Sequence, residues 1–313
     1  MIFDALCRYS SKPRADRIVS LSRLCVGAAV SRQSLWQYKR TQKQEMMRSE
    51  NIIEEVKNIR EVHHKQGARE LYRTIKASDN HSLLDKCGRD KFEEMLLNKG
   101  FRVVIRRNFI KTTQSGPGRF PNRIAGMEIR DINKVWMSDI TYYQLVSQQN
   151  LLCTFYLTSI IDAYSRLCLG VAGSQTLVTE DTTLPAMQMA LKYRQNMPQN
   201  ELIFHSDGGG QYYDNKFLNL LKKHNITSSM AKTVYENPFI ERFNGIMKND
   251  YLYPEHINSF NQLKKNALNF MNVYNTQRRH SSLGHITPVE FESRLDDTPI
   301  LQRKPLHIKK IEL

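Results

Sequence analysis

The sequence predicts an α/β protein in which small all-α domains precede a larger domain built on a β-sheet. The first indication is charge: residues 1–124 carry 26 Lys and Arg against 13 Asp and Glu, whereas residues 125–313 carry 20 against 18. The second is that segments rich in β-branched and aromatic residues become frequent only from Lys134 onward. The third is length, since 313 residues suit more than one domain. A basic region beside a nearly neutral one is typical of a polyanion-binding arm attached to an enzyme domain.

The composition excludes several other classes of protein. Hydrophobic residues make up 40% and charged residues 25% of the chain, as in ordinary globular proteins. No apolar run approaches the roughly 18 residues that cross a bilayer, and the N-terminus lacks an export signal. We therefore expect a cytoplasmic, nucleoid-associated protein without a membrane partner. The five cysteines are scattered, which disfavours a disulfide framework, and a solvated helical pair is a better explanation of His63 and His64 than a zinc site.

Residues 1–45 are expected to form a helix-turn-helix-like DNA-binding segment. Apolar residues recur at helical spacing before Gly27, which interrupts the pattern, and Ser31 is a good N-cap for a second helix. This order resembles the motif that places its second helix in the major groove of DNA. A helical pair that only packs is the alternative, and the basic charge of the segment favours DNA contact. The side chains expected to contact DNA here are Arg32, Gln33, Lys39 and Arg40.

Four further segments follow in the predicted organisation. Residues 46–105 are predicted to form a helical DNA-binding domain, with a helix over residues 89–98. Residues 106–130 are polar and basic and are expected to be a linker. Residues 131–291 form the predicted catalytic core, and residues 292–313 a C-terminal tail.

The order of elements in the core predicts a ribonuclease-H-like α/β fold, a mixed five-stranded sheet with flanking helices. Three consecutive strands come first, and helices then alternate with strands. The predicted strands cover residues 135–146, 151–161, 166–172, 201–206 and 226–230. The predicted helices cover residues 179–194, 215–224, 238–252 and 260–277.

Two aspartates in this core are candidates for phosphodiester chemistry, which uses a few carboxylates that converge on two divalent ions roughly 3.5–4 Å apart. Mg²⁺ (or Mn²⁺) favours oxygen ligands and keeps several waters, so a few carboxylates suffice. Asp139 lies inside the first strand, where a carboxylate is disfavoured unless it faces an edge or a site. Asp207 ends the fourth strand, and the three glycines that follow it permit close approach of backbone and phosphate.

The third candidate, Glu241, lies in the opening turn of a helix for which Asn237 is a suitable N-cap. Asn244 and Lys248 follow at spacings of three and seven and therefore share its helix face. Lys248 is placed to meet a phosphate, and Asn244 and Arg242 are further candidate DNA contacts beside Glu241.

Each acid also has a structural explanation. Asp139 could be a solvated edge residue, Asp207 a turn former and Glu241 a complement to the helix dipole. Their joint occurrence in this order favours a triad. Asp162 is better explained as a turn residue than as a metal ligand, and His205 is as readily a satisfied strand-end histidine as an orienting group.

Six motifs follow one another between Trp136 and Phe291, over about half of the chain. They are Trp136-x-x-Asp139-Ile140-Thr141-Tyr142, Asp162-x-x-Ser165-Arg166, His205-Ser206-Asp207-x-Gly209-x-Gln211-Tyr212, Ser229-Met230, Glu241-x-Phe243-x-x-x-x-Lys248 and Tyr274-Asn275-x-x-Arg278-x-His280-x-x-Leu283-Gly284-x-x-Thr287-Pro288. In this order they resemble the integrase-like catalytic core of bacterial insertion-sequence transposases, in particular the second-reading-frame (OrfB) protein of the third insertion-sequence family.

The resemblance implies a ribonuclease-H-like fold, element-end DNA as substrate, and Asp139, Asp207 and Glu241 as a metal-binding DDE triad. It also includes Arg278, which could clamp DNA phosphates, with a packing role as a close alternative. The chain departs from the family in the stretch between Asp207 and Glu241, which has 33 residues, two fewer than usual. The shortening falls around residues 232–236, where a loop absorbs it at small cost, and Glu236 is the fallback ligand.

The combined pattern predicts a transposase of the DDE type. With two Mg²⁺ ions it would cleave double-stranded DNA at the element ends and pass the freed 3′-hydroxyl directly to a new phosphodiester, because no Ser or Tyr flanked by a base demands a covalent intermediate. A ribonuclease-H-like nuclease without strand transfer and a DNA-binding regulator without catalysis are the alternatives. We expect a homo-oligomer on DNA, and a fusion or complex with an upstream-frame DNA-binding protein stays open.

Overall fold

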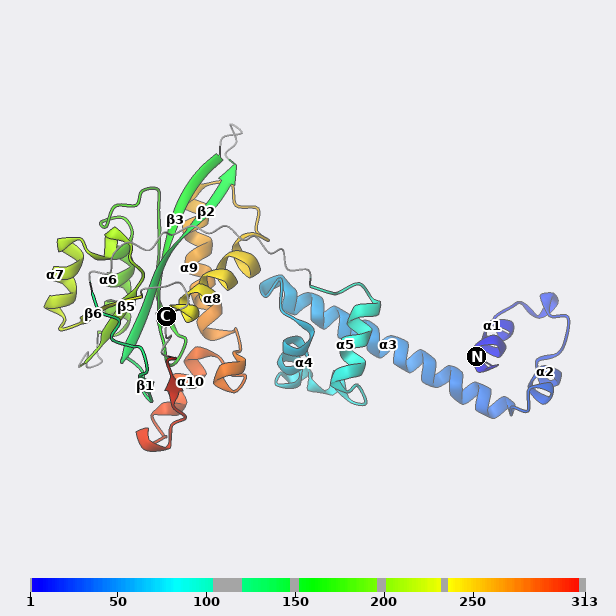
Figure 1. Cartoon of the computed structure of the whole chain (residues 1–313). Coiled ribbons are helices and arrows are strands. Elements are labelled where there is room, and N and C mark those ends of the chain that lie inside the picture. Colours follow the sequence, from blue (N-terminus) through cyan, green and yellow to red (C-terminus); the bar gives the residue numbers. More distant parts are fainter. Residues whose placement is uncertain (1, 104–119, 147–151, 196–200, 232–235, 310–313) are drawn as a thin grey trace. The chain divides into compact units, whose positions relative to one another are not determined.

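The computed structural model divides into two compact units (Figure 1). The helical unit comprises Met1–Glu61 and Gly67–Arg102, and the core unit comprises Val62–Gln66 and Val103–Leu313. No helix among the described residues is long and apolar enough to cross a membrane. The described residues are 2–103, 120–146, 152–195, 201–231 and 236–309.

The helical unit is built from helices throughout its described residues. Ser20 caps the second of them, and Ser31 Oγ accepts a hydrogen bond from the Ser34 N–H at 2.9 Å, which confirms the predicted cap at the start of the third. Between these two helices Ala29 has a φ of 52°, so the chain turns there through a left-handed residue. The helices are α1 (Ile2–Ser10), α2 (Leu21–Gly27), α3 (Arg32–Val62), α4 (Ala68–Lys76) and α5 (Arg89–Asn98).

Helix α3 passes straight through the predicted boundary between residues 45 and 46, because no Gly or Pro interrupts it. Its N-terminal part packs Leu35 against Leu6 and Cys25. Its C-terminal part contributes to a second core, with α4 and α5, made of Ile52, Val56, Leu71, Ile75, Leu84, Cys87, Phe92 and Leu96. Two small hydrophobic cores therefore share one long helix.

The core unit contains a mixed five-stranded sheet whose strand order is β4-β3-β2-β5-β6. Strands β2, β3 and β4 are antiparallel neighbours, whereas β5 and β6 run parallel to β2. This order, with three meandering strands before two parallel ones, is the ribonuclease-H-like topology that the sequence predicts. The strands are β2 (Val135–Val146), β3 (Leu152–Asp162), β4 (Cys168–Ser174), β5 (Ile203–Ser206) and β6 (Thr227–Met230).

Helices cover both faces of this sheet (Figure 1). On one face α6 and α7 bury a cluster that includes Trp136 and Phe217. On the other face α8 and α9 bury a cluster that includes Met137 and Phe270. Trp136 and Met137 are neighbours on β2 and point to opposite faces, as the two-residue period of a strand requires. The helices are α6 (Thr183–Tyr193), α7 (Asn215–Lys223), α8 (Pro238–Ile246) with a π-helical continuation over Met247–Leu252, α9 (Phe260–Thr276) and α10 (Pro288–Leu295).

The C-terminal segment belongs to the core unit, which differs from the predicted division into a core over 131–291 and a tail over 292–313. Helix α10 crosses that boundary, and its Glu292 forms a buried ion pair with Arg194 and accepts a hydrogen bond from Ser165. Strand β7 (Leu306–His307) pairs with β1 (Glu128–Ile129), which lies within the predicted linker. A capping box at Thr287 starts α10, and the helix continues past residue 291 to Leu295. Of the predicted linker, residues 106–119 lie outside the described residues.

Candidate active site

Strand β2 presents Asp139 and Thr141 on the same face, toward α8. The Asn244 side-chain amide donates a hydrogen bond to Asp139 Oδ2 at 2.8 Å, and Lys248 Nζ donates to Thr141 Oγ1 at 2.7 Å. Asp139 and Thr141 are two positions apart on a strand, and Asn244 and Lys248 are four positions apart on a helical segment. Each of these spacings returns the side chain to the same face, so the two pairs can meet. Helix α8 is thereby held along the part of β2 that carries Asp139.

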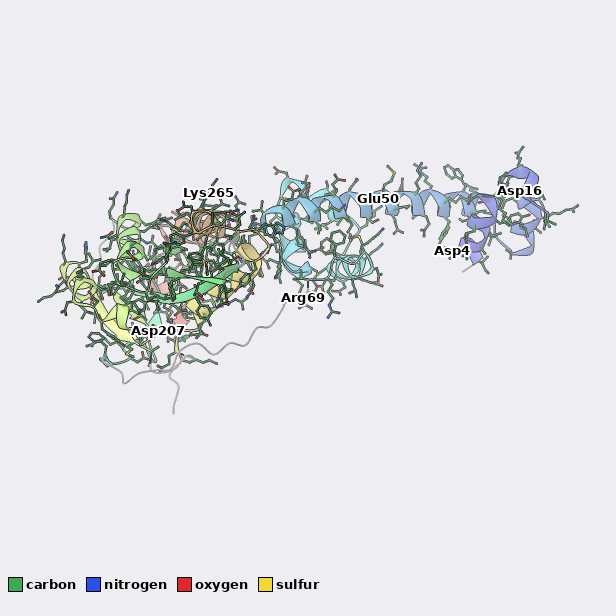
Figure 2. All side chains as sticks on the ribbon, turned by 90° about the horizontal axis from the view of Figure 1, so that it is seen from above. Asp4, Asp16, Glu50, Arg69, Asp207 and Lys265 are labelled. Carbon is green, nitrogen blue, oxygen red and sulfur yellow. The ribbon has the colours of Figure 1, made fainter. Side chains whose placement is uncertain are left out.

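Asp207 follows directly after β5, the strand that runs parallel to β2. Figure 2 labels Asp207 among the side chains of the core unit. The N–H of Gly209 donates to Asp207 Oδ1 at 3.1 Å. A Cβ at position 209 would lie 3.2 Å from that same oxygen and 3.1 Å from Gln211 Oε1. The glycine therefore permits a close approach of backbone and carboxylate, which is the role that the sequence predicts for the glycines after Asp207.

Glu241 lies in the first turn of α8, three residues before Asn244. Its side chain is exposed, in contrast to that of Asn244. Pro238 occupies the first helical position, as expected. The two-residue shortening that the resemblance implies is expected around residues 232–236, of which 232–235 lie outside the described residues.

Burial and mutual repulsion raise the pKa values of these acids. The pKa of Asp139 is raised to about 6, first by burial and then by the charge of Asp207, while the Asn244 hydrogen bond lowers it. The pKa of Glu241 is raised to about 7 by partial burial of its carboxyl group, although the residue as a whole is exposed, and by the charge of Asp139. Burial also raises the pKa of Asp207, against the lowering effect of the Gly209 N–H. The charge of Asp139 thus interacts with a group on each of the other two elements.

The donor set of this site suits a hard divalent cation. All three acids offer oxygen, the ligand atom that Mg²⁺ prefers, and a cation would relieve the repulsion that, after burial, raises the pKa values of Asp139 and Glu241. Within the described ranges, no three His, Cys, Asp or Glu side chains already stand close enough to hold a metal ion. A Mg²⁺ site that completes its shell with water and substrate phosphate does not require such a closed cage.

Two other residues that the sequence singles out have structural partners. Asp162 Oδ1 accepts hydrogen bonds from the N–H groups of Tyr164 and Ser165, and its Oδ2 accepts one from that of Asn133, so the turn role is confirmed. His205 is buried, and its Nδ1 lies 2.9 Å from Ser229 Oγ.

The structure favours the packing role for Arg278. Its guanidinium forms a half-buried ion pair with Asp250 at 3.2 Å and also contacts the Tyr251 hydroxyl. His63 corrects the expectation of a solvated histidine pair, because it is buried and its Nδ1 lies 2.7 Å from the Tyr251 hydroxyl. The sequence does not reveal this contact because His63 and Tyr251 are 188 residues apart.

The predicted DNA-contacting residues of the helical unit lie at the start of α3. Arg32, Gln33 and Arg40 are exposed and Lys39 is half-buried. The exposed ring of Trp36 lies under the Arg40 guanidinium, 5.6 Å from it. In the core unit Arg242 is exposed, whereas Asn244 is buried against Asp139. The contacts of Asn244 are therefore those of a residue that orients a carboxylate.

Sequence reasoning misses the contacts that join the three acid-bearing elements. Tyr212 and Ser138 share a hydrogen bond at 2.9 Å, and the Asn237 amide donates to the Ser138 carbonyl at 3.1 Å. The only signal in the sequence is that Ser138 adjoins Asp139 and that Tyr212 closes the motif that begins before Asp207. Asn237 is at the N-cap position, as predicted, but its side chain makes no capping bond.

The fold and the elements that carry the three acids define the class of integrase-like, ribonuclease-H-like catalytic domains. Two family models described as integrase core domain match the chain, over residues 130–235 and 224–288. Integrase core domains generally depend on divalent metal ions.

The similar curated proteins include several from bacterial insertion sequences. Transposase InsF for insertion sequence IS3A of Escherichia coli strain K12 is 34% identical over 165 residues, which cover 52% of this chain and 54% of that protein. The insertion element IS600 uncharacterized 31 kDa protein of Shigella sonnei is 30% identical over 213 residues, which cover 66% of this chain and 75% of that protein. The chain belongs to the IS3 family of insertion-sequence transposases. It spans about half the length of the InsF proteins that it matches.

Solved structures with a similar fold include the HTLV-2 integrase catalytic core domain in complex with magnesium. That domain is 16% identical, with a TM-score of 0.39, and the match covers 56% of this chain and 99% of the domain. A chain in the structure of the simian T-cell lymphotropic virus intasome in complex with PP2A regulatory subunit B56 gamma is 14% identical, with a TM-score of 0.44, and the match covers 77% of this chain and 79% of that one.

Proposed function

We propose that this chain is a DDE transposase that cleaves transposon-end DNA and transfers the freed 3′-hydroxyl into a new phosphodiester. The observation that carries the proposal is the arrangement of three acid-bearing segments in a ribonuclease-H-like core. Asn244 and Lys248 hold the helix of Glu241 against β2 at Asp139, and Asp207 directly follows β5, which pairs in parallel with β2. The charge of Asp207 raises the pKa of Asp139, and the charge of Asp139 raises that of Glu241, in keeping with this arrangement. Membership in the IS3 family supports the same chemistry.

The three carboxylates are the proposed ligands of two Mg²⁺ or Mn²⁺ ions. When bound, the ions would supply the positive charge that stabilises the attacking and leaving oxygens of the displacement. Asn244 orients Asp139 through its 2.8 Å hydrogen bond. Lys248, whose Nζ donates to Thr141 on β2, is the proposed contact to a DNA phosphate beside the acids. Glu241 is the proposed third ligand, and Glu236 is its fallback.

Duplex DNA is the proposed partner of both units. In the helical unit the exposed basic side chains Arg32 and Arg40 would contact phosphates, and the exposed Gln33 would contact a base edge. Lys39 adds a further cation on the same helix, and Arg242 is the proposed phosphate contact of the core unit. We further propose that the chain works as a homo-oligomer on DNA in the nucleoid, alone or with an upstream-frame DNA-binding protein.

The test uses the full chain and a labelled duplex that ends in the terminal repeat of the element from which the gene comes. With Mg²⁺ we expect strand cleavage at the repeat and joining of the 3′ end to a second duplex. Asp207→Asn should abolish both reactions, whereas Asp297→Asn, which neutralises an exposed acid near the end of α10, should change neither. Equal activity of the wild type and Asp207→Asn would refute the assignment.

The same assay separates the rival functions. A duplex that is already cut and carries a free 3′-hydroxyl bypasses the cleavage step. If the chain only hydrolyses this substrate, it is a nuclease without strand transfer. If the chain binds the duplex and neither cuts nor joins it with Mg²⁺ or Mn²⁺, it is a DNA-binding regulator.

A further inference from the structure

Ser138 is fully buried next to Asp139 and points to the opposite face of the sheet. Its hydroxyl donates to the Ser159 carbonyl on β3 at 2.9 Å. A serine hydroxyl has only one hydrogen, so the 2.9 Å contact with Tyr212 is a bond that the tyrosine hydroxyl donates to Ser138 Oγ. The backbone carbonyl oxygen of Ser138 accepts a hydrogen bond from the Asn237 side-chain amide at 3.1 Å.

Tyr212 links Ser138 to the turn that carries Asp207. It ends a short 3₁₀ turn (Gly210–Tyr212) that begins three residues after Asp207. Its ring is buried and packs against Phe204 and Phe217 at centroid distances of 5.9 and 5.8 Å. The ring therefore has a fixed position, and its hydroxyl ties the Asp207 turn to the strand residue that precedes Asp139.

Asn237 links Ser138 to the helix that carries Glu241. The residue is buried at the N-cap position of α8, where an asparagine side chain ordinarily accepts a bond from the first turn. Here the side chain makes no capping bond, and its amide donates to β2 instead. The Asn237 carbonyl accepts a bond from the Glu241 N–H at 3.3 Å. The backbone of Glu241 is thus two hydrogen bonds away from Ser138.

We propose that Ser138, Tyr212 and Asn237 are positioning residues that together fix the spacing of the three carboxylates, and with it the affinity of the chain for divalent metal. This inference rests on the proposed function, because it presumes that Asp139, Asp207 and Glu241 bind the ions. Ser138 is common to both links of this network. Its hydroxyl accepts the bond from Tyr212 in the turn after Asp207, and its carbonyl accepts the bond from Asn237 at the start of the Glu241 helix.

The expected effect follows from what such supporting groups do at metal sites. Loss of a group that orients a ligand typically weakens metal affinity by about 10–100-fold. Tyr212→Phe removes a single oxygen and keeps the ring that packs against Phe204 and Phe217. Asn237→Ala removes the donor to β2 and leaves the backbone bond to Glu241. Both changes act on metal affinity without altering a proposed ligand.

The experiment is a titration of the full-length chain with Mn²⁺, in which electron paramagnetic resonance reports the free ion. We expect Tyr212→Phe and Asn237→Ala to weaken Mn²⁺ binding by about tenfold or more. The matched control is Tyr164→Phe, which removes a tyrosine hydroxyl that donates to the Lys304 carbonyl at 3.0 Å, outside this network. It should bind Mn²⁺ like the wild type. Thermal unfolding of each variant identifies any that fails to fold. If Asn237→Ala fails to fold, Tyr212→Phe alone decides the test.

A double-mutant cycle tests whether the Ser138–Tyr212 bond itself matters. Ser138→Ala combined with Tyr212→Phe should weaken Mn²⁺ binding no more than Ser138→Ala alone, because Ser138→Ala already removes the bond to Tyr212 together with the bond to the Ser159 carbonyl. Wild-type affinity in folded Tyr212→Phe and Asn237→Ala would overturn the inference, provided that Asp139→Asn loses binding. If Asp139→Asn also binds Mn²⁺ like the wild type, the proposed function itself fails.

Discussion

The hydrogen bond from Asn244 to Asp139 gives the sharpest test of how the site works. Asn244→Ala removes a buried donor that lies 2.8 Å from Asp139 Oδ2. A hydrogen bond to a charged group contributes about 1.5–3 kcal/mol. Because each 1.4 kcal/mol corresponds to about a factor of ten in rate, cleavage should slow by about 10–100-fold if the bond is needed to present the carboxylate.

The assay is single-turnover cleavage of the terminal-repeat duplex at saturating Mg²⁺, which separates the chemical step from DNA binding. A matched control is Asn275→Ala, because Asn275 is equally buried and its side chain makes two 2.8 Å hydrogen bonds, both to the backbone of Cys168. That variant should lose stability, yet once folded it should cleave at the wild-type rate. A folded Asn244→Ala variant whose rate stays within about twofold of the wild type would refute the argument.

Three further predictions follow from single contacts. In Gly209→Ala the new methyl would press on Asp207, so we expect cleavage to slow by about 3–10-fold with little change in the melting temperature, and an unchanged rate would contradict this. Arg278→Met should lower the free energy of unfolding by about 2–4 kcal/mol, since it leaves Asp250 without this ion pair. It should leave the salt dependence of DNA affinity unchanged. A weaker dependence of DNA affinity on salt would instead reveal that Arg278 contacts a phosphate. Burial lowers the pKa of His280 to about 3. Between pH 6.5 and about pH 3 this histidine is therefore protonated in the unfolded chain and neutral in the folded chain, so the free energy of unfolding decreases as the pH falls through that range. His280→Phe keeps an aromatic ring that does not titrate. Between pH 7 and pH 5, urea unfolding of this variant should show a smaller loss of stability than in the wild type, by at most about 1.4 kcal/mol per pH unit.

Local sequence signals account for the elements that carry the acids. Strand β2 has the predicted bounds, Val135–Val146, because its run of β-branched and aromatic residues is long enough to identify a strand without help from its neighbours. Helix α7 begins at the predicted residue, Asn215, where the Asp214 side chain accepts a bond from the Lys216 N–H. Strong local patterns of this kind place Asp139 on β2 and fix the start of the helix that follows the Asp207 turn.

Contacts between distant segments leave no such signal. Strands β1 and β7 pair over only two residues each, too few for any periodic pattern, so a tail was predicted where the chain returns to the core. The burial of His63 depends on Tyr251, 188 residues away. The sequence also does not reveal that the Asn237 side chain bonds to β2 and makes no capping bond, because an asparagine at an N-cap position has the same sequence signature in both cases.

The two faces of β2 carry residues with different roles in the proposed site. Asp139 and Thr141 point toward α8, where Asn244 and Lys248 meet them, while Ser138 points to the opposite face and reaches the Asp207 turn from there. A slip of one residue in the register of β2 would exchange these faces, bury the carboxylate among the α6 and α7 side chains and turn the serine toward the acids. The antiparallel ladder with β3, paired continuously from Trp136 to Val146, opposes that slip. The long β2–β3 hairpin therefore keeps the proposed metal ligand and its anchor in a fixed relation, which a shorter strand pair would hold less firmly.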